Sequence, residues 1–158
     1  MTIITVVAPE GRLDLETRRK LVPLLTDAVM VAEIGRLHPP ARVGFQVHFQ
    51  TLARDAMAIG GKLLCDHEKP RDVMTMNLKV MDAVWPDELR ARAITGVLAA
   101  MAEGCGLPAP SPTWWVNFEV VPEGSWGSRG RVLSILDLLE TGAFTEERAA
   151  EIRAALQA

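Results

Sequence analysis

The sequence of residues 43–50, VGFQVHFQ, alternates strictly between two kinds of side chain. Valine and phenylalanine fall on one face of the stretch, and glycine, glutamine and histidine fall on the other. A period of two is typical of a β-strand with one buried face. The sequence of residues 114–120, WWVNFEV, alternates in the same way, with Trp115 and Asn117 on the polar face. We therefore predict a half-buried strand at each of these positions.

A helix is predicted upstream of each of these strands. Apolar residues recur at spacings of three and four within residues 21–32 and again within residues 94–101. Each helix follows an apolar stretch, residues 3–8 and 73–80, that predicts a further strand. The leucines at 21, 24 and 25 map onto residues 94, 97 and 98 at an offset of 73, and residues 47, 49 and 61 map onto 116, 118 and 130 at an offset of 69. The chain therefore contains one strand–helix–strand unit twice.

The repeat predicts the fold class. A crossover through a helix is right-handed, so the two strands of each unit run parallel and both helices lie on one face of the sheet. Two units joined edge to edge give an α/β fold with a four-stranded sheet. We expect residues 1–140 to form one domain made of two repeats, at about 2–68 and 73–140, and residues 141–158 to form a C-terminal helix capped at Thr145. The other sheet face also needs covering, most simply by another subunit.

Composition argues against several classes of partner. Seventeen basic and twenty acidic residues give a net charge of −3 without a long block of one sign, which disfavours nucleic acid and anionic membrane surfaces. No apolar run approaches the roughly 20 residues of a membrane-spanning helix, and the first residues lack the features of a signal peptide, so we expect a cytoplasmic protein. Two cysteines are too few for a disulfide framework. Three scattered histidines predict no metal site, and no cofactor is expected.

Several segments in a fixed order resemble the tautomerase superfamily. They are a short first strand ending in Pro9-Glu10-Gly11-Arg12, the strand of residues 43–50, the turn Ile59-Gly60-Gly61, and the strand of residues 114–118 with Gly130 after it. The resemblance covers about residues 2–140. It is closest to fused members related to 4-oxalocrotonate tautomerase and to the cis-3-chloroacrylic acid dehalogenases. It implies a β-α-β, MIF-like fold, usually a trimer of fused chains, and a small cavity near the amino terminus for short carboxylic or α-keto acids.

The resemblance also implies candidate site residues. In that family an amino-terminal proline is the catalytic acid or base, whereas this chain has Thr2 at the corresponding position. The Thr2 amine takes that place only if Met1 is removed, and it can then act as a base or form an imine with a keto acid. Arg12 matches a substrate-binding arginine, and its planar fork suits a carboxylate. Gln46 stands where the second arginine belongs. Trp115 and Asn117 lie on the polar face, where a cavity or a subunit contact would have to be.

Two readings of the function follow. In the first, the chain is a tautomerase-like enzyme that transfers a proton on a small α-keto or unsaturated carboxylic acid. In the second, it is a non-catalytic or nearly inactive relative that binds small carboxylates or serves as an assembly subunit. Hydration-type dehalogenation is not expected, because Ser128 stands where the water-activating glutamate of the dehalogenases belongs. Both readings predict a homotrimer. Trp85 and Trp126 are candidates for its interface.

Overall fold

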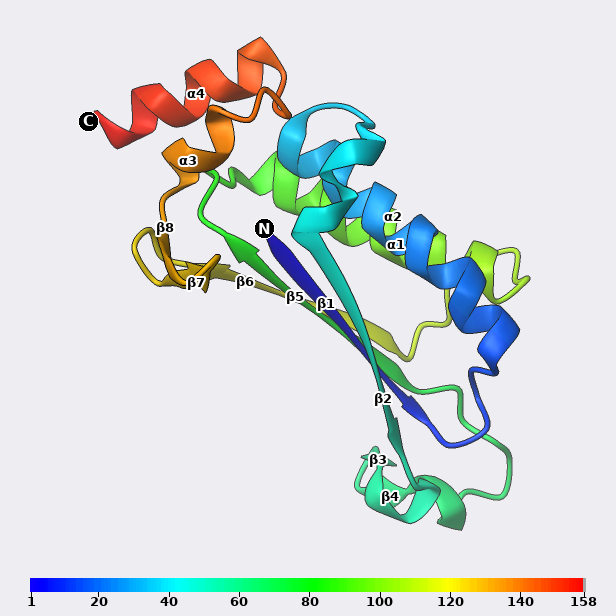
Figure 1. Ribbon diagram of the computed structural model, residues 1–158. Helices are drawn as coiled ribbons and strands as arrows, with labels where there is room; N and C mark the ends of the chain where they lie inside the picture. The colour runs from blue at the N-terminus through cyan, green and yellow to red at the C-terminus, as the bar shows by residue number, and fades with distance from the viewer. Residues whose placement is uncertain (158) are drawn as a thin grey trace.

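The computed structural model describes residues 1–157, and its centre is a mixed four-stranded sheet (Figure 1). Its strands are β1 (Thr2–Pro9), β2 (Phe45–Leu52), β5 (Met74–Met81) and β6 (Trp114–Val121), in the order β2-β1-β5-β6. β1 pairs with β2, and β5 with β6, in parallel, while β1 and β5 pair antiparallel. The predicted four-stranded sheet and its parallel pairs are confirmed. The amino end of β1 therefore lies beside the carboxyl end of β5.

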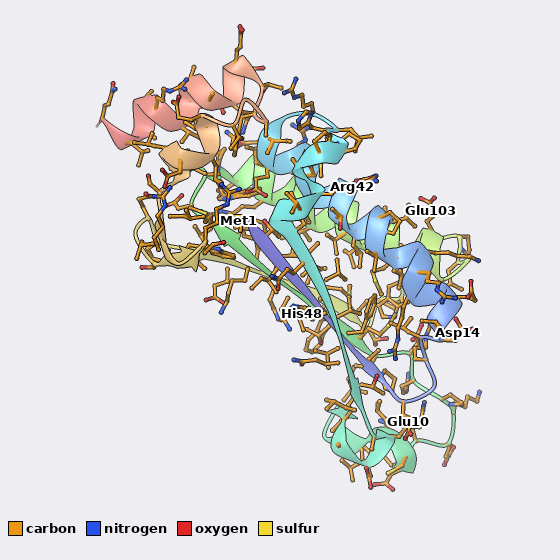
Figure 2. The ribbon with its side chains drawn as sticks, viewed as in Figure 1. Met1, Glu10, Asp14, Arg42, His48 and Glu103 are labelled. Atoms are coloured by element: carbon orange, nitrogen blue, oxygen red, sulfur yellow. The ribbon has the colours of Figure 1, made fainter. Side chains whose placement is uncertain are left out.

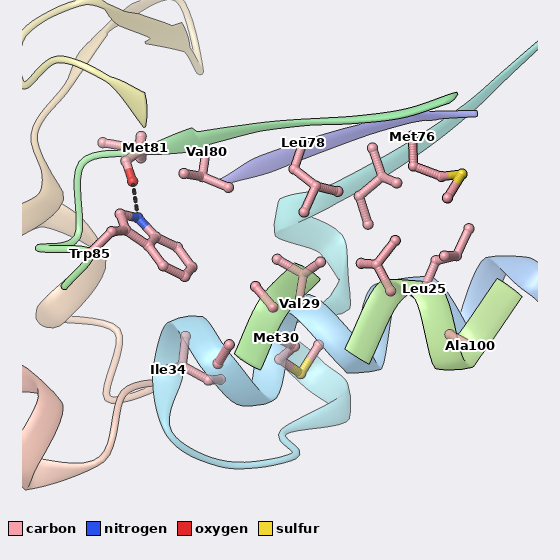
Figure 3. Packing of buried hydrophobic residues seen from close by; sticks show 14 of the residues in the cluster. Leu25, Val29, Met30, Ile34, Met76, Leu78, Val80, Met81, Trp85 and Ala100 are labelled. Carbon is pink, nitrogen blue, oxygen red and sulfur yellow. Dashed lines mark hydrogen bonds between the residues drawn. The ribbon is translucent and has the colours of Figure 1, made fainter. Parts of the chain in front are cut away.

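Two long helices, α1 (Leu15–Ile34) and α2 (Asp87–Gly104), cover the same face of this sheet, as predicted (Figure 1). Asp14 caps α1, because its carboxylate accepts a hydrogen bond from the Thr17 backbone N–H at 2.7 Å. Between helices and sheet lies a core in which Leu78 and Val80 of β5 face Leu25 and Val29 of α1 (Figure 3). The apolar stripe of each helix therefore faces the apolar side of the sheet.

Short elements extend both ends of the sheet. The 3₁₀ helix η1 (Pro39–Gly44) leads into the amino end of β2. At the carboxyl end of β2 follow the 3₁₀ helix η2 (Arg54–Ala56), the hairpin of β3 (Ala58–Ile59) and β4 (Lys62–Leu63), and the 3₁₀ helix η3 (Leu64–Asp66). After β6 come the hairpin of β7 (Trp126–Ser128) and β8 (Arg131–Leu133), then α3 (Ile135–Leu139) and α4 (Glu146–Leu156). Thr145 caps α4 as predicted, whereas α3 has no counterpart in the sequence-based expectations.

One boundary of the sequence prediction is wrong. The strand expected at residues 43–50 begins at Phe45, and Val43 is 87% exposed and belongs to η1. The prolines at positions 39 and 40 explain the difference, because they favour the start of a short 3₁₀ helix, and this helix includes the residues up to Gly44. Trp85 is also misplaced as an interface candidate. Its ring is buried and donates from Nε1 to the Met81 carbonyl at 3.0 Å (Figure 3). The same ring packs edge-on against Phe118.

The second face of the sheet is open and largely polar. One row of residues crosses all four strands on this face, in the order His48, Thr5, Asn77 and Asn117. The Asn117 amide donates to the Asn77 side-chain oxygen at 2.9 Å. Nothing within the described chain covers this row. No helix in residues 1–157 combines the length and the apolar character needed to span a membrane.

Candidate functional site

A cavity of about 250 Å³ lies at the amino end of β1. Its walls come from the first residue of the chain, the end of α1, η1, the β7–β8 turn, α3 and the segment after α3. Figure 2 labels Met1 at this end of β1. Most of the lining is apolar, and Ile34, Phe45 and Phe144 contribute to it. The polar exceptions include the amino terminus, Glu33 and Arg129. The cavity therefore combines an apolar lining with ionisable groups of both signs, a composition typical of a small-ligand site.

Glu33 is the buried acid of this site. It occupies the next position of a stripe at every fourth residue of α1, after Leu21, Leu25 and Val29, and only 1% of its side chain is exposed. The amino-terminal nitrogen of Met1 donates to Oε1 at 3.0 Å, and the Thr2 hydroxyl donates to Oε2 at 2.9 Å. Both carboxylate oxygens are thus satisfied by the first two residues of β1, as a buried charge requires. The sequence signal was a charged residue on an otherwise apolar helix stripe.

Arg129 is the basic residue of the site. It occupies the first position of the two-residue turn between β7 and β8, with φ +53°, a left-handed conformation that non-glycine residues seldom adopt. Arg129 is exposed, and its charge contributes to the lowered pKa of Asp137, but within residues 1–157 its guanidinium makes no hydrogen bond or ion pair. A strained arginine with unused donors at a cavity wall is a candidate anion-binding group. Its position in a Gly-containing turn gave no hint of this in the sequence.

Thr2 and Gln46, both predicted site residues, do lie close to this cavity. They line a second hollow of about 180 Å³ together with Met1 and Trp126. The side chain of Thr2 is 1% exposed and points towards Glu33, whereas the Gln46 oxygen meets His48 Nε2 at 3.0 Å. Met1, Val43 and Gly44 line both hollows, so the two hollows adjoin.

Arg12 lies at the other end of β1. Eight strand residues at roughly 3.3 Å each separate it by about 25 Å from the amine, and Figure 2 shows Met1 and Glu10 far apart. Arg12 makes a bidentate ion pair with Asp72, at 2.6 and 3.0 Å, and lies over the Trp114 ring. The pairing raises the pKa of Arg12. Within one chain, therefore, the predicted guanidinium and the predicted amine do not meet, because they stand at opposite ends of one extended strand.

The two remaining predicted residues lie outside the cavity as well. Trp115 is 61% exposed at the amino end of β6, which is the end away from the cavity. Asn117 lies in the polar row of the open sheet face. Trp114, in contrast, is buried in the core as predicted. In residues 1–157 no group of three or more histidine, cysteine, aspartate or glutamate side chains could hold a metal ion.

No protein-family model and no curated protein matches this sequence. Solved structures do match its fold. One is described as Pt0534 inactivated by 2-oxo-3-pentynoate, with a TM-score of 0.66, 20% identity, and 86% of this chain and 98% of that chain covered. A second, N1 of the cis-3-chloroacrylic acid dehalogenase family, has a TM-score of 0.67, 17% identity, and coverage of 96% and 99%. A third is macrophage migration inhibitory factor of Toxoplasma gondii, at 0.60 and 14%, with 83% and 99% covered.

Proposed function

From the tautomerase fold of this chain, we propose that it transfers a proton on a small α-keto or unsaturated carboxylic acid bound at the amino end of β1. One observation carries the proposal: an amine and a buried carboxylate lie 3.0 Å apart at the wall of a cavity that is also lined by Arg129, whose guanidinium makes no hydrogen bond or ion pair within residues 1–157. A structural relative with this fold is described as inactivated by 2-oxo-3-pentynoate, an α-keto acid. A proton carrier and an anion-binding group are the two parts that such chemistry needs.

Each group has a role in the proposal. Arg129 binds the substrate carboxylate through its unused donors. The amino-terminal amine and Glu33 hold and move the proton at the carbon next to the carbonyl. If Met1 is removed, the Thr2 amine becomes the terminal group. Because Met1 lines both hollows, its removal would enlarge the space beside the second hollow, where Gln46 can donate to a carboxylate.

The assembly is part of the proposal. Fused 4-oxalocrotonate tautomerase structures of the same fold are described as symmetric and asymmetric trimers. We propose a cytoplasmic homotrimer in which the open polar sheet face, with Trp115 and Asn117, is buried between subunits. Arg12 could then serve a neighbouring chain, provided that a substrate carboxylate replaces Asp72.

The second candidate is a carboxylate-binding or assembly subunit without catalysis. The arrangement around Glu33 favours it as long as Met1 is present, because both carboxylate oxygens are occupied and the amine is held in an ion pair. The mass of the intact, untagged protein shows whether Met1 remains. If it does, the Thr2 amine mechanism is excluded.

Ketonisation of phenylenolpyruvate and of 2-hydroxymuconate tests the enzymatic reading. Arg129→Gly should raise KM roughly tenfold or more, because a hydrogen-bonded charge contributes about 1.5–3 kcal/mol and each 1.4 kcal/mol is tenfold. Glycine also relieves the left-handed backbone, so unfolding cannot explain the loss. Arg71→Ala, at an exposed arginine outside the cavity, is the control.

Trapping and gain of function complete the test. Borohydride with a keto acid should label the terminal amine, and a protein without a label would count against imine chemistry. Thr2→Pro should increase ketonisation. If the wild type neither turns over nor binds any of these acids, the proposal is refuted.

A further inference from the structure

One wall of the cavity comes from outside the repeated units. Thr141, Ala143 and Phe144 line it, and they belong to the segment between α3 and α4; Leu138, near the end of α3, also lines the cavity. The tandem repeat predicts nothing about this segment. The ionisable groups, in contrast, come from β1, α1 and the β7–β8 turn. The charged wall and this apolar wall therefore have separate structural origins.

The apolar wall is fixed in place by the end of α1. The Thr145 N–H donates to the Ile34 carbonyl at 2.9 Å, and Arg36 donates to the carbonyls of Gly142 and Ala143 at 2.6 and 3.0 Å. Contact at Gly35 is so close that an added Cβ would lie 2.6 Å from Thr145 Oγ1. Backbone anchors on both sides of Phe144 leave its ring little freedom to move away.

A buried arginine of α4 strengthens the same attachment. Arg148 donates to the Glu33 carbonyl at 3.3 Å and to the carbonyls of Ala83 and Val84 at 2.7 and 3.0 Å, and it pairs with Glu151. These bonds satisfy a carbonyl at the end of α1. They also hold the loop after β5, in which Val84 has a positive φ. The helix that directly follows the apolar wall is therefore bonded to the backbone of Glu33, the acidic residue of the site.

We infer that Phe144 limits the length of the apolar tail of the acid that this cavity accepts. The inference rests on the proposed function, since it concerns the same site. The Phe144 ring is 8% exposed, is packed in the core and faces the cavity, so a ligand cannot displace it without disrupting core contacts. An acid held by its carboxylate extends its tail along the apolar lining. One carbon more or less in such a pocket changes kcat/KM or affinity roughly tenfold or more.

The test uses unbranched α-keto acids of increasing length, from pyruvate to 2-oxooctanoate. Exchange of their C3 protons for deuterium, followed by NMR, measures proton transfer directly, and saturation-transfer NMR measures binding without catalysis. Phe144→Ala should shift the preference towards the longer acids by tenfold or more. Phe144→Leu, a milder change, should shift it in the same direction and serves if the alanine variant does not fold.

Leu139→Ala is the matched control. Leu139, the last residue of α3, is buried and does not line the cavity, so its truncation should lower stability and leave the length preference unchanged. If Phe144→Ala and Leu139→Ala showed the same preference among acids of different length, the inference would be overturned. Binding without exchange in the wild type would refute the proposed catalysis, while the binding ratios would still decide the role of Phe144. If the wild type shows neither binding nor exchange, the proposed catalysis and the inference on Phe144 are both refuted.

Discussion

Glu33→Gln is the substitution that most directly tests the centre of the site. The amide keeps the size of the side chain but has one acceptor oxygen, so it cannot accept from both the Met1 amine and the Thr2 hydroxyl. The amide N–H can donate to the Thr2 hydroxyl, which accepts as well as donates, but the carboxylate charge that pairs with the Met1 amine is lost. Hydrogen bonds to charged groups contribute about 1.5–3 kcal/mol, and the Met1 side chain is 20% exposed, so we take a value near the lower end, about 2 kcal/mol.

That loss should be visible in unfolding experiments. For a chain of this size, 1 kcal/mol corresponds to roughly 2–4 °C in Tm, so Glu33→Gln should lower Tm by about 4–8 °C. Urea unfolding followed by tryptophan fluorescence should show a lower midpoint with an unchanged m-value. Glu103→Gln, at an exposed position near the end of α2, should stay within about 0.5 kcal/mol of wild type.

A double-mutant cycle with Thr2→Val sharpens the measurement. Because the hydroxyl and the carboxylate are in direct contact, their effects should be non-additive by about 0.5–3 kcal/mol. A Glu33→Gln protein as stable as wild type, or additive effects in the cycle, would refute the view that the first two residues of β1 hold a buried carboxylate.

Three further predictions concern other parts of the molecule. Gly35→Ala should lower the free energy of unfolding by more than Gly142→Ala, measured by urea unfolding, because both have positive φ but only Gly35 would bring a Cβ against a neighbouring side chain. Hydrogen bonds from Arg131 lower the pKa of Asp137. The ionised Asp137 carboxylate therefore stabilises the fold above the unfolded-state pKa of about 3.9, and this stabilisation is lost as pH falls through the lower folded-state pKa. Asp137→Asn should therefore make stability less dependent on pH in acid, and wild type and variant should converge at the lowest pH. Finally, a disulfide reagent should modify Cys65 before Cys105. The pKa of both thiols is raised, so the order follows from access, because Cys65 is exposed and Cys105 is partly buried; mass spectrometry of digested protein identifies the order.

Most of the fold was predictable because its signals are local. A strand with one buried face repeats every two residues and a helix stripe about every four, so both periods are visible without knowing any partner. The error at Val43 shows the limit of this reasoning. The alternating pattern of the strand extends back to Val43, but Val43 belongs to the 3₁₀ helix that the two prolines begin. The site was predictable only in part. Thr2 and Gln46 lie near the cavity, whereas Arg12 lies at the far end of β1.

By itself, the sequence determined the duplicated strand–helix–strand unit, the sheet with helices on one face, and the place of the chain's first residues at a strand end. The tertiary structure alone decided which charges meet there. Glu33 is separated from Met1 by 32 positions along the chain, and Arg129 reaches the cavity from the second repeat. Such meetings depend on the antiparallel joining of β1 to β5 and on how loops close over the strand end. Neither the joining of these strands nor the closure of the loops can be predicted from a local period in the sequence.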